Sequence, residues 1–325
     1  MGAPASVDLK SLGDRRFFVE LGSGGEGRVY AIPGQKDVVY KEFLSLSATS
    51  PDTSALATLI DLRNRWSQED RDWLDQRTVW PRTAVMNGAL LKGFLMPRIA
   101  GTYFRKHGVR TNPRIIPCEW NYLSFKDRYI KNPNISSEVP RAQLSEVLNL
   151  IADLSRTIEI LHSYDIVLGD ISGRNLLWTN NPAFRCLIID NDSFRFTGSG
   201  GVASPKQSPD WEDPHLGQKP TSVDSDIYKL ALAAYRGLWS AGTNRPSSSS
   251  LLASKQFGVP DEVVEIIQRS TAKDGRPTAQ EWVSACKTQT LPSQSSPKRS
   301  SIPVVADSNL GATRNSQPVV GGVAG

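Results

Sequence analysis

The 325-residue chain has little cysteine and no long apolar run. Its three cysteines, Cys118, Cys186 and Cys286, are far apart and lack the spacing of a metal site, so we expect a reducing, cytoplasmic environment. No apolar stretch approaches the roughly 18 residues that a membrane-spanning helix needs, so no membrane association is expected. The N-terminal segment also lacks the apolar core of a secretory signal. The modest net charge of +5 permits an anionic ligand but does not require nucleic acid.

Apolar residues, 39% of the chain, change their period along the sequence. They alternate with polar residues in the N-terminal third, which predicts strands, and recur at steps of three and four afterwards, which predicts helices. This change predicts an α+β fold with two lobes and a cleft between them. The expected strands cover residues 15–45 and 89–99, and the expected helices cover 54–77, 141–163, 225–239 and 260–287, with Ser225 as a candidate N-cap.

Three segments fall outside this pattern. Residues 1–14 are interpreted as an N-terminal extension, and residues 288–325, rich in Ser, Pro and Gly, are predicted to form a disordered tail. Residues 101–137 contain several prolines and are predicted to be irregular. Within them, residues 105–131 hold seven Lys and Arg against two acidic residues. We call residues 101–137 the basic insertion. We interpret residues 105–131 as a docking surface for an acidic partner or as a solvated face, rather than as a nucleic-acid site.

A glycine cluster lies between the first expected strands. In "LGSGGEGRVYAI" (21–32), Gly22, Gly24 and Gly27 have the spacing G-x-G-x-x-G. A dinucleotide-binding fold would need a helix directly after the last glycine, whereas a strand-like sequence follows here. The spacing therefore favours a glycine-rich hairpin that covers phosphates, with an ordinary hairpin turn as the alternative.

Polar side chains follow several apolar runs. Lys41 lies in the short apolar strand "DVVYKEF", Asp170 and Asn175 lie between "IVL" and "LLW", and Asp190 and Asp192 follow "CLII". Phosphoryl transfer needs a carboxylate that orients the incoming hydroxyl and hard oxygen ligands for Mg²⁺. These residue types meet that need, although Asp and Asn also cap turns and helices.

Taken together, these residues resemble the protein-kinase signature in type, order and distance. The matching positions are Gly22, Gly24, Gly27, Lys41, Asp170, Asn175 and Asp190. Further along, "SPDWEDPHL" (208–216) is similar to the segment that ends in Ala-Pro-Glu, Asp226 matches the start of the central helix, and Arg276 matches an Arg near the kinase C-terminus. "GFLMPRI", "GDISGRN" and "IDNDSF" resemble a bacterial kinase-like family with Gly-Asp-x-x-x-x-Asn and Asp-x-Asp-Ser-Phe motifs. The resemblance covers residues 15–287.

The resemblance implies a two-lobed protein kinase-like fold and an ATP- and Mg²⁺-dependent kinase of protein Ser or Thr. Residues 15–97 would form a lobe with a small antiparallel β-sheet and one helix, and residues 98–287 a larger, mainly helical lobe. It also implies a role for each matching residue: Gly22, Ser23, Gly24, Gly27 and Val29 cover the nucleotide, Lys41 pairs with its phosphates, Met96 to Ile99 lie against adenine, Asp170 is the base, and Asn175 and Asp190 bind Mg²⁺, with Asp192 as the runner-up for Asp190.

Departures from the family pattern leave several roles open. Leu168 and Gly169 replace the usual His-Arg, so we expect no need for activation-loop phosphorylation. Ser172 replaces the usual Lys, and Arg174 could supply the missing charge.

Two ion pairs of the family also need substitutes. Asp213 could replace the Glu that pairs with Arg276. The helix acid that should pair with Lys41 is either Asp61 or Glu69, and the apolar neighbours of Asp61 favour it slightly.

Two other functions remain open on the sequence alone. One is a pseudokinase or nucleotide-binding scaffold, because several auxiliary motifs are altered. The other is a small-molecule kinase on the same fold, which the activation-segment-like stretch 193–216 disfavours.

Overall fold

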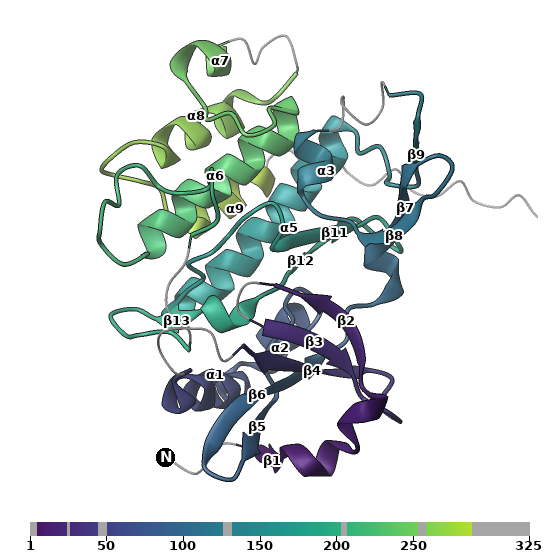
Figure 1. Ribbon diagram of the computed structural model, residues 1–325. Coiled ribbons are helices and arrows are strands. Elements are labelled where there is room, and N and C mark those ends of the chain that lie inside the picture. The colour runs from purple at the N-terminus through teal and green to yellow at the C-terminus, as the bar shows by residue number, and fades with distance from the viewer. Residues whose placement is uncertain are drawn as a thin grey trace, which may run out of the picture. The chain divides into compact units, whose positions relative to one another are not determined.

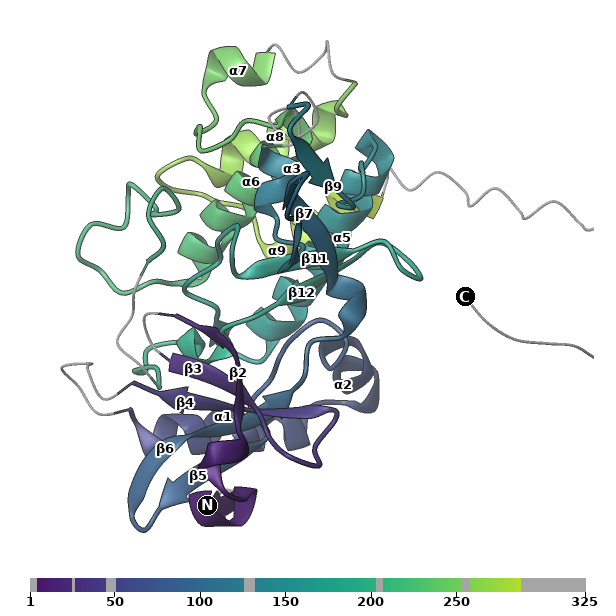
Figure 2. The same cartoon turned by 45° about the vertical axis from the view of Figure 1, so that its right-hand side comes forward.

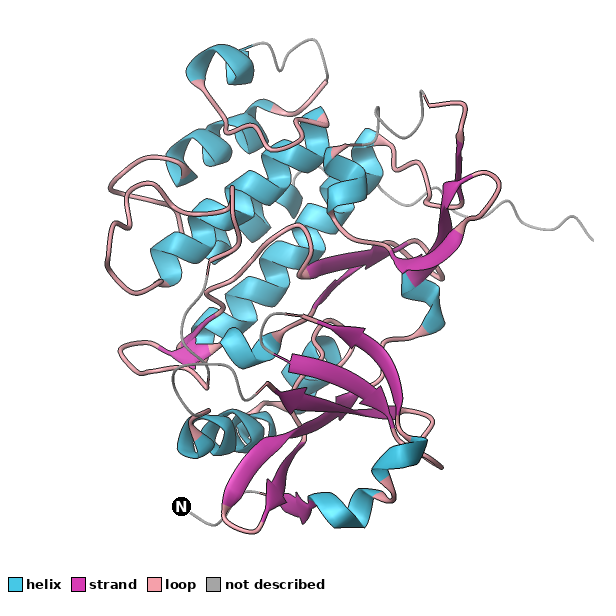
Figure 3. Cartoon of the chain, viewed as in Figure 1, coloured by secondary structure: helices cyan, strands magenta, loops and turns pink. Residues whose placement is uncertain are grey.

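The computed structural model describes residues 5–24, 27–44, 51–125, 132–202, 207–252 and 258–287. These residues form a mixed α and β fold, in which the strands of one sheet come from the N-terminal third and most helices follow later (Figures 1 and 3). The expected α+β class is therefore confirmed. No helix among the described residues is long and apolar enough to cross a membrane. The predicted tail at 288–325 lies outside the described residues.

A six-stranded sheet holds the N-terminal part together, with the order β1-β5-β6-β4-β3-β2. Its strands are β1 (Ser6–Asp8), β2 (Val19–Ser23), β3 (Gly27–Ala31), β4 (Val38–Phe43), β5 (Thr83–Asn87) and β6 (Leu90–Pro97). Residues 15–45 and 89–99 thus contain strands, as expected. β1 lies within the predicted N-terminal extension 1–14 and pairs in parallel with β5, so the expectation of an antiparallel sheet was wrong for this pair of strands.

The two faces of this sheet carry different clusters because side chains alternate along a strand. Tyr40 and Val85 belong to a small cluster on one face, which is covered by the chain around the 3-10 helix Leu9–Leu12. Val39 and Phe94 belong to the main core on the opposite face. Lys41 lies two residues after Val39 and shares its face, so the ammonium is directed into the protein.

Two helices occupy the segment where one was expected. They are α1 (Thr53–Arg65) and α2 (Gln68–Leu74). The break follows Trp66, which packs edge-on against Trp80, and Ser67 then caps α2 by accepting from the Asp70 amide. The apolar side chains of α1, Leu56, Leu59, Ile60 and Leu62, join the main core.

Contrary to the expectation from the sequence, the described residues of the basic insertion are not irregular throughout. The insertion contains a three-stranded sheet in the order β8-β7-β9, with β7 (Phe104–Val109), β8 (Arg114–Pro117) and β9 (Ile135–Ser137), and the short helix α3 (Asn121–Ser124). Figure 2 shows β7 and β9 beside α3, away from the six-stranded sheet. Its residues 126–131, which supply three of the counted basic side chains, lie outside the described residues.

Long helices form the C-terminal part. They are α5 (Leu144–Ser163), α6 (Val223–Trp239), α8 (Asp261–Ser270) and α9 (Ala279–Lys287), with the shorter α7 (Ser248–Leu252). α5 packs against α6 and α9, and α6 also packs against α8. Ser222, rather than the expected Ser225, is the N-cap of α6.

Two small antiparallel pairs lie next to α5 and carry the polar loops. β10 (Ile166–Val167) pairs with β13 (Arg195–Phe196), and β11 (Leu176–Thr179) pairs with β12 (Arg185–Ile188). The loop between β10 and β11 and the turn between β12 and β13 therefore connect the same two strand pairs. These two connections contain five of the predicted site residues: Asp170, Arg174, Asn175, Asp190 and Asp192.

Candidate active site

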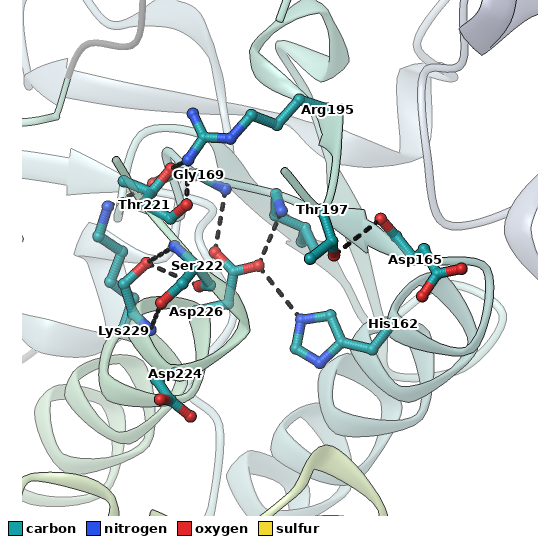
Figure 4. Close-up of polar contacts among 12 residues, drawn as sticks. His162, Asp165, Gly169, Arg195, Thr197, Thr221, Ser222, Asp224, Asp226 and Lys229 are labelled. Atoms are coloured by element: carbon teal, nitrogen blue, oxygen red, sulfur yellow. Dashed lines mark hydrogen bonds and ion pairs between the residues drawn. The ribbon is translucent and has the colours of Figure 1, made fainter. Parts of the chain in front are cut away.

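The first turn of α6 supports the loop between β10 and β11 through the side chain of Asp226. Asp226 accepts hydrogen bonds from the Leu168 amide at 2.7 Å and the Gly169 amide at 2.9 Å, and lies 3.2 Å from Nε2 of His162 on α5 (Figure 4). Asp226 is fully buried, so it is tolerated only because these donors surround it. Gly169 adopts φ +79°, a left-handed conformation that a side chain would strain.

A buried lysine supports the same loop. Lys229, three residues after Asp226 on α6, is fully buried and donates from Nζ to the Gly169 carbonyl. Burial lowers the pKa of Lys229, although the charges of Asp226 and Asp170 partly offset this. The backbone at Gly169 therefore contacts Asp226 through its amide and Lys229 through its carbonyl.

Asp170 and Asn175 face each other across this loop. Nδ2 of Asn175 donates to Oδ2 of Asp170 at 3.0 Å and to the Asp170 carbonyl at 2.9 Å. Both bonds use the amide nitrogen, so they do not consume the amide oxygen of Asn175. Asp170 also accepts from the amide of Ser208 at 2.9 Å and from its hydroxyl at 3.1 Å.

Lys41 reaches the turn after β12, although 149 residues separate it from Asp190. Its Nζ lies 3.1 Å from Oδ1 of Asp190 and 2.5 Å from Oδ1 of Asp192. Burial alone would lower the pKa of Lys41, but the charges of Asp192 and Asp190 outweigh burial and raise it. The ammonium is therefore positively charged despite being almost completely buried.

The two carboxylates on this turn differ in exposure and conformation. The side chain of Asp190 is 54% exposed, whereas that of Asp192 is 1% exposed. Asp190 has φ +59° and ψ +45°, which is uncommon for a residue other than glycine and costs about 1 kcal/mol. The backbone thus accepts strain at the residue that presents the open carboxylate.

The loop and the turn are adjacent in space. The carbonyl of Asn175 accepts from the Ile189 amide at 2.9 Å, and the Ser193 hydroxyl donates to the Leu168 carbonyl at 3.1 Å. Since Ile189 precedes Asp190, the contacts bring Asp170, Asn175, Asp190 and Lys41 into one region. The predicted charged and amide groups of the site are therefore brought together.

The glycine cluster forms a hairpin between β2 and β3, as the sequence predicted. The Gly24 amide donates to the Gly27 carbonyl at 2.9 Å, and Val29 pairs with Lys41 on β4. A Cβ on Gly27 would lie 2.6 Å from the Glu42 carbonyl and 3.3 Å from Cε of Lys41. Gly27 is therefore required where β3 passes the lysine, while Gly22, Ser23 and Gly24 are exposed.

The predicted adenine segment leaves the sheet at the end of β6. Met96 is buried and pairs with Val39, whereas Ile99 is half-buried. The Arg98 amide donates to the Asp37 carbonyl at 2.8 Å. Pro97 has no amide hydrogen, so it cannot donate to a ligand here.

Two sequence-based assignments are not supported by the geometry. Arg174 is exposed, and its charge acts on Glu119, whose pKa is raised by burial and lowered in part by Asn121 and Arg174. Neither helix acid reaches Lys41: Asp61 is 63% exposed and pairs with Arg65 at 3.5 Å, and Glu69 is exposed at the start of α2. Lys41 instead pairs with the carboxylates of the turn after β12.

The expectation that Asp213 pairs with Arg276 is confirmed. Asp213 and Arg276 form a two-point contact, with Oδ2 to Nη1 at 2.5 Å and Oδ1 to Nη2 at 3.0 Å. Both side chains are 3% exposed. The contact joins the segment after Ser208 to the chain before α9.

Sequence reasoning missed Ser208 and Lys229 as neighbours of the Asp170 loop. Lys229 carries a sequence signal, because a lone lysine within the apolar run "IYKLALAA" must either reach the surface or find buried partners. Ser208 carries none, since its contact depends on how the chain returns over the Asp170 loop.

The residues at the site suit a nucleotide phosphate and Mg²⁺. One observation is that the backbone at Gly27 passes close to Lys41, where a Cβ would fill the space beside the lysine side chain. Another is the donor set, which combines an open carboxylate on Asp190 with the amide oxygen of Asn175, and hard oxygen ligands of this kind suit Mg²⁺. Among the described residues, no group of three or more His, Cys, Asp and Glu side chains is placed to hold a metal ion.

Comparisons with protein-family models and with curated proteins find no significant match to the chain.

Proposed function

We propose that the chain is an ATP- and Mg²⁺-dependent protein kinase that transfers the γ-phosphoryl group to Ser or Thr, with the two-lobed fold of that class. The observation that carries this proposal is the convergence of Lys41 with Asp190 at 3.1 Å. It supports the proposal because the pair joins the glycine-rich sheet to the loop region that bears Asp170 and Asn175. Such catalysis depends on positioning and charge rather than on covalent chemistry of the protein.

Each residue then has a defined role. The ammonium of Lys41 would bind phosphate oxygens, and the oxygens of Asp190 and Asn175 would hold Mg²⁺. Magnesium-bound ATP supplies the phosphoryl group and neutralises the charge that develops during transfer. The hairpin from Gly22 to Gly27 would cover the phosphates with backbone, and the segment from Met96 to Ile99 would contact the base.

Asp170 would orient the acceptor hydroxyl and take its proton. Its Oδ2 already lies 3.1 Å from the hydroxyl of Ser208, within the range that proton transfer to a general base requires. The bond to Asn175 fixes the orientation of the carboxylate. An acceptor Ser or Thr would have to replace or share the Ser208 contact.

The test is transfer of radiolabel from γ-labelled ATP to a generic protein substrate, followed by identification of the labelled residues. We expect Asp170→Asn to reduce transfer by about 10³-fold or more while ATP still binds. Lys41→Met should abolish the thermal shift with ATP and Mg²⁺. Asp61→Asn removes an exposed carboxylate on α1 and serves as the matched control, with no change in either measurement.

The outcomes separate the alternatives. Binding of ATP without transfer in the wild-type protein would indicate a pseudokinase or scaffold. Transfer to a small molecule but not to protein would indicate a small-molecule kinase. Absence of any thermal shift with ATP and Mg²⁺ would refute nucleotide binding itself.

We further propose that activity does not depend on phosphorylation of the segment after β13. The hydroxyls of Thr197 and Ser199 donate to nearby carbonyls, those of Asp165 and Phe196. Gly169 stands where the resemblance expects the arginine that would read a phosphate. The double variant Thr197→Ala/Ser199→Ala should therefore keep most of the transfer rate. A loss of 100-fold or more, with an unchanged melting temperature, would contradict this. Ser208 is left intact because it contacts Asp170, and Ser204 lies outside the described residues.

A docking role for the basic insertion remains a proposal. Its β7–β8 hairpin exposes basic side chains at Lys106, Arg110 and Arg114, together with Ile115, which is 71% exposed. Arg105 is used internally, since it donates to the carbonyls of Thr102 and Phe104. The exposed charges are suited to an acidic protein partner.

A further inference from the structure

We propose that Asp192 positions Lys41, so that the counter-ion comes from the turn after β12 and not from a helix. This inference rests on the proposed function, in which Lys41 binds phosphate. It assigns different work to two carboxylates that are two residues apart: Asp192 holds the lysine, and Asp190 remains open for the metal. Asp192 is accordingly a positioning residue rather than a catalytic one.

The geometry of the pair carries the proposal. Asp192 Oδ1 lies 2.5 Å from Lys41 Nζ, closer than Asp190 Oδ1 at 3.1 Å. The side chains of Lys41 and Asp192 are 6% and 1% exposed, so water cannot readily replace either partner. The attraction between the two charges is strong in such surroundings, and removal of one partner leaves an uncompensated buried charge.

The turn that carries Asp192 is anchored on both sides. The neighbouring Asn191 accepts through Oδ1 from the Val79 amide at 3.2 Å, and Ser193 donates to the Leu168 carbonyl at 3.1 Å. Phe194, which follows, packs edge-on against Trp80 with ring centroids 5.8 Å apart. The carboxylate of Asp192 is thus fixed relative both to the segment before β5 and to the Asp170 loop.

On the side of α1 that faces the core, the side chains are apolar, and none is an acid that could pair with Lys41. Leu56, Leu59, Ile60 and Leu62 face the core, and Asp61 faces solvent, where it pairs with Arg65. Because no acid of α1 contacts the lysine, a shift of α1 would not break the Lys41–Asp192 pair. The proposal therefore predicts a phosphate-binding lysine whose position is independent of that helix.

One oxygen of Asp192 suggests a second role for this residue, that of a metal ligand. Oδ2 of Asp192 is buried and has no hydrogen-bond partner among the described residues. A buried carboxylate oxygen without a partner is costly, so it could instead be a metal ligand. The test must therefore separate lysine positioning from metal binding.

The first measurement uses the protein without nucleotide. Double-mutant cycles of urea unfolding combine Lys41→Met with Asp192→Asn, with Asp190→Asn or with Asp61→Asn. We expect Lys41 and Asp192 to be coupled by about tenfold or more in the unfolding equilibrium constant, Asp190 by clearly less, and Asp61 not at all. Equal or greater coupling to Asp190 would overturn the proposal, whether or not the protein is a kinase.

The second measurement is ATP affinity by calorimetry over a range of Mg²⁺ concentrations. Asp192→Asn should weaken ATP binding about as much as Lys41→Met does while leaving the Mg²⁺ concentration for half-maximal binding unchanged. Asp190→Asn should raise that Mg²⁺ concentration by about tenfold or more. A raised Mg²⁺ requirement in Asp192→Asn but not in Asp190→Asn would make Asp192 the metal ligand and overturn the assignment.

Folding of the variants is monitored by circular dichroism. If Asp192→Asn does not fold, Asp192→Ser replaces it, because the smaller side chain leaves room for water beside Lys41. Asp192→Glu keeps the charge and should retain part of the ATP affinity. Failure of the wild-type chain to bind ATP would refute the proposed function but leave the outcome of the unfolding cycles interpretable.

Discussion

The buried pair of Asp213 and Arg276 is the residue-scale contact whose removal we expect to cost the most. Both side chains are 3% exposed and meet through two hydrogen bonds. Asp213→Asn should lower the free energy of unfolding by about 3–5 kcal/mol, because Arg276 would keep a buried charge without its partner. Urea unfolding at pH 7 measures this loss, with Asp61→Asn as an exposed control. A loss under about 1 kcal/mol, typical of a surface pair, would contradict the prediction.

The same pair predicts an acid-dependent loss of stability. Burial would raise the pKa of Asp213, but Arg276 and the amide of His215 lower it below its usual range. The folded state therefore binds a proton less readily than an unfolded Asp, whose pKa is about 3.9. The stabilisation is complete above about pH 4 and is lost as the pH falls through the folded-state pKa. Unfolding curves between pH 3 and 7 should show this slope in the wild type and a weaker one in Asp213→Asn.

Single residues were predictable where the chemistry allowed few choices. Lys41, Asp170, Asn175 and Asp190 were singled out because an amine, a carboxylate, an amide and a further carboxylate occur in this order within or next to apolar runs. The partner of Lys41 was not, because periodicity on α1 shows only which residues face the core. Asp61 is next to those positions in sequence but points outward, since a helix turns by 100° per residue.

Close packing between β4 and β6 gives a prediction at the scale of the element. A Cβ on Gly93 would lie 2.0 Å from the carbonyl oxygen of Lys41 and 2.9 Å from the Tyr40 ring. Gly93→Ala should force the strands apart and destabilise the protein by about 3 kcal/mol or more. Thermal unfolding tests this, with Gly101→Ala as the control, because no heavy atom lies within 4 Å of that Cβ. Equal melting temperatures for the two variants would show that the strands adjust freely.

Elements with an uninterrupted period were predicted best. Helix α5 has apolar residues at steps of three and four over 20 residues, and it forms within the predicted range. The strands of the basic insertion were missed because they are short, carry several charges and are interrupted or separated by prolines, which hides the two-residue period of side chains in a strand. The break between α1 and α2 was missed because a serine N-cap inside a continuous helical pattern is a weak signal.

Contacts between the strand-rich and helix-rich parts lead to a prediction for the whole molecule. Arg77, before β5, lies 2.7 Å from Asp153 on α5, and the side chains are 11% and 9% exposed. The Cys186 amide donates to the same carboxylate at 2.9 Å. Because the described residues belong to one compact unit, we expect one cooperative unfolding transition, with tryptophan fluorescence and circular dichroism giving the same midpoint.

Arg77→Met tests this coupling directly. It removes the charge opposite Asp153, so we expect a loss of about 3–5 kcal/mol that is the same by both probes. Arg65→Met, whose partner Asp61 is exposed, should leave the midpoint unchanged. Separate midpoints for fluorescence and circular dichroism in Arg77→Met would show that the two parts can unfold independently.

The left-handed backbone of Asp190 places the stability of the folded chain and the proposed role of its carboxylate in opposition. A glycine at this position would relieve the local strain and so favour the folded chain, yet it would delete the carboxylate that we propose as a Mg²⁺ ligand. Directed evolution that selects only for heat resistance should therefore accept glycine at residue 190 readily. Selection for the proposed phosphoryl transfer should reject it. The residue found at this position would then show which of the two selections a population of variants has experienced.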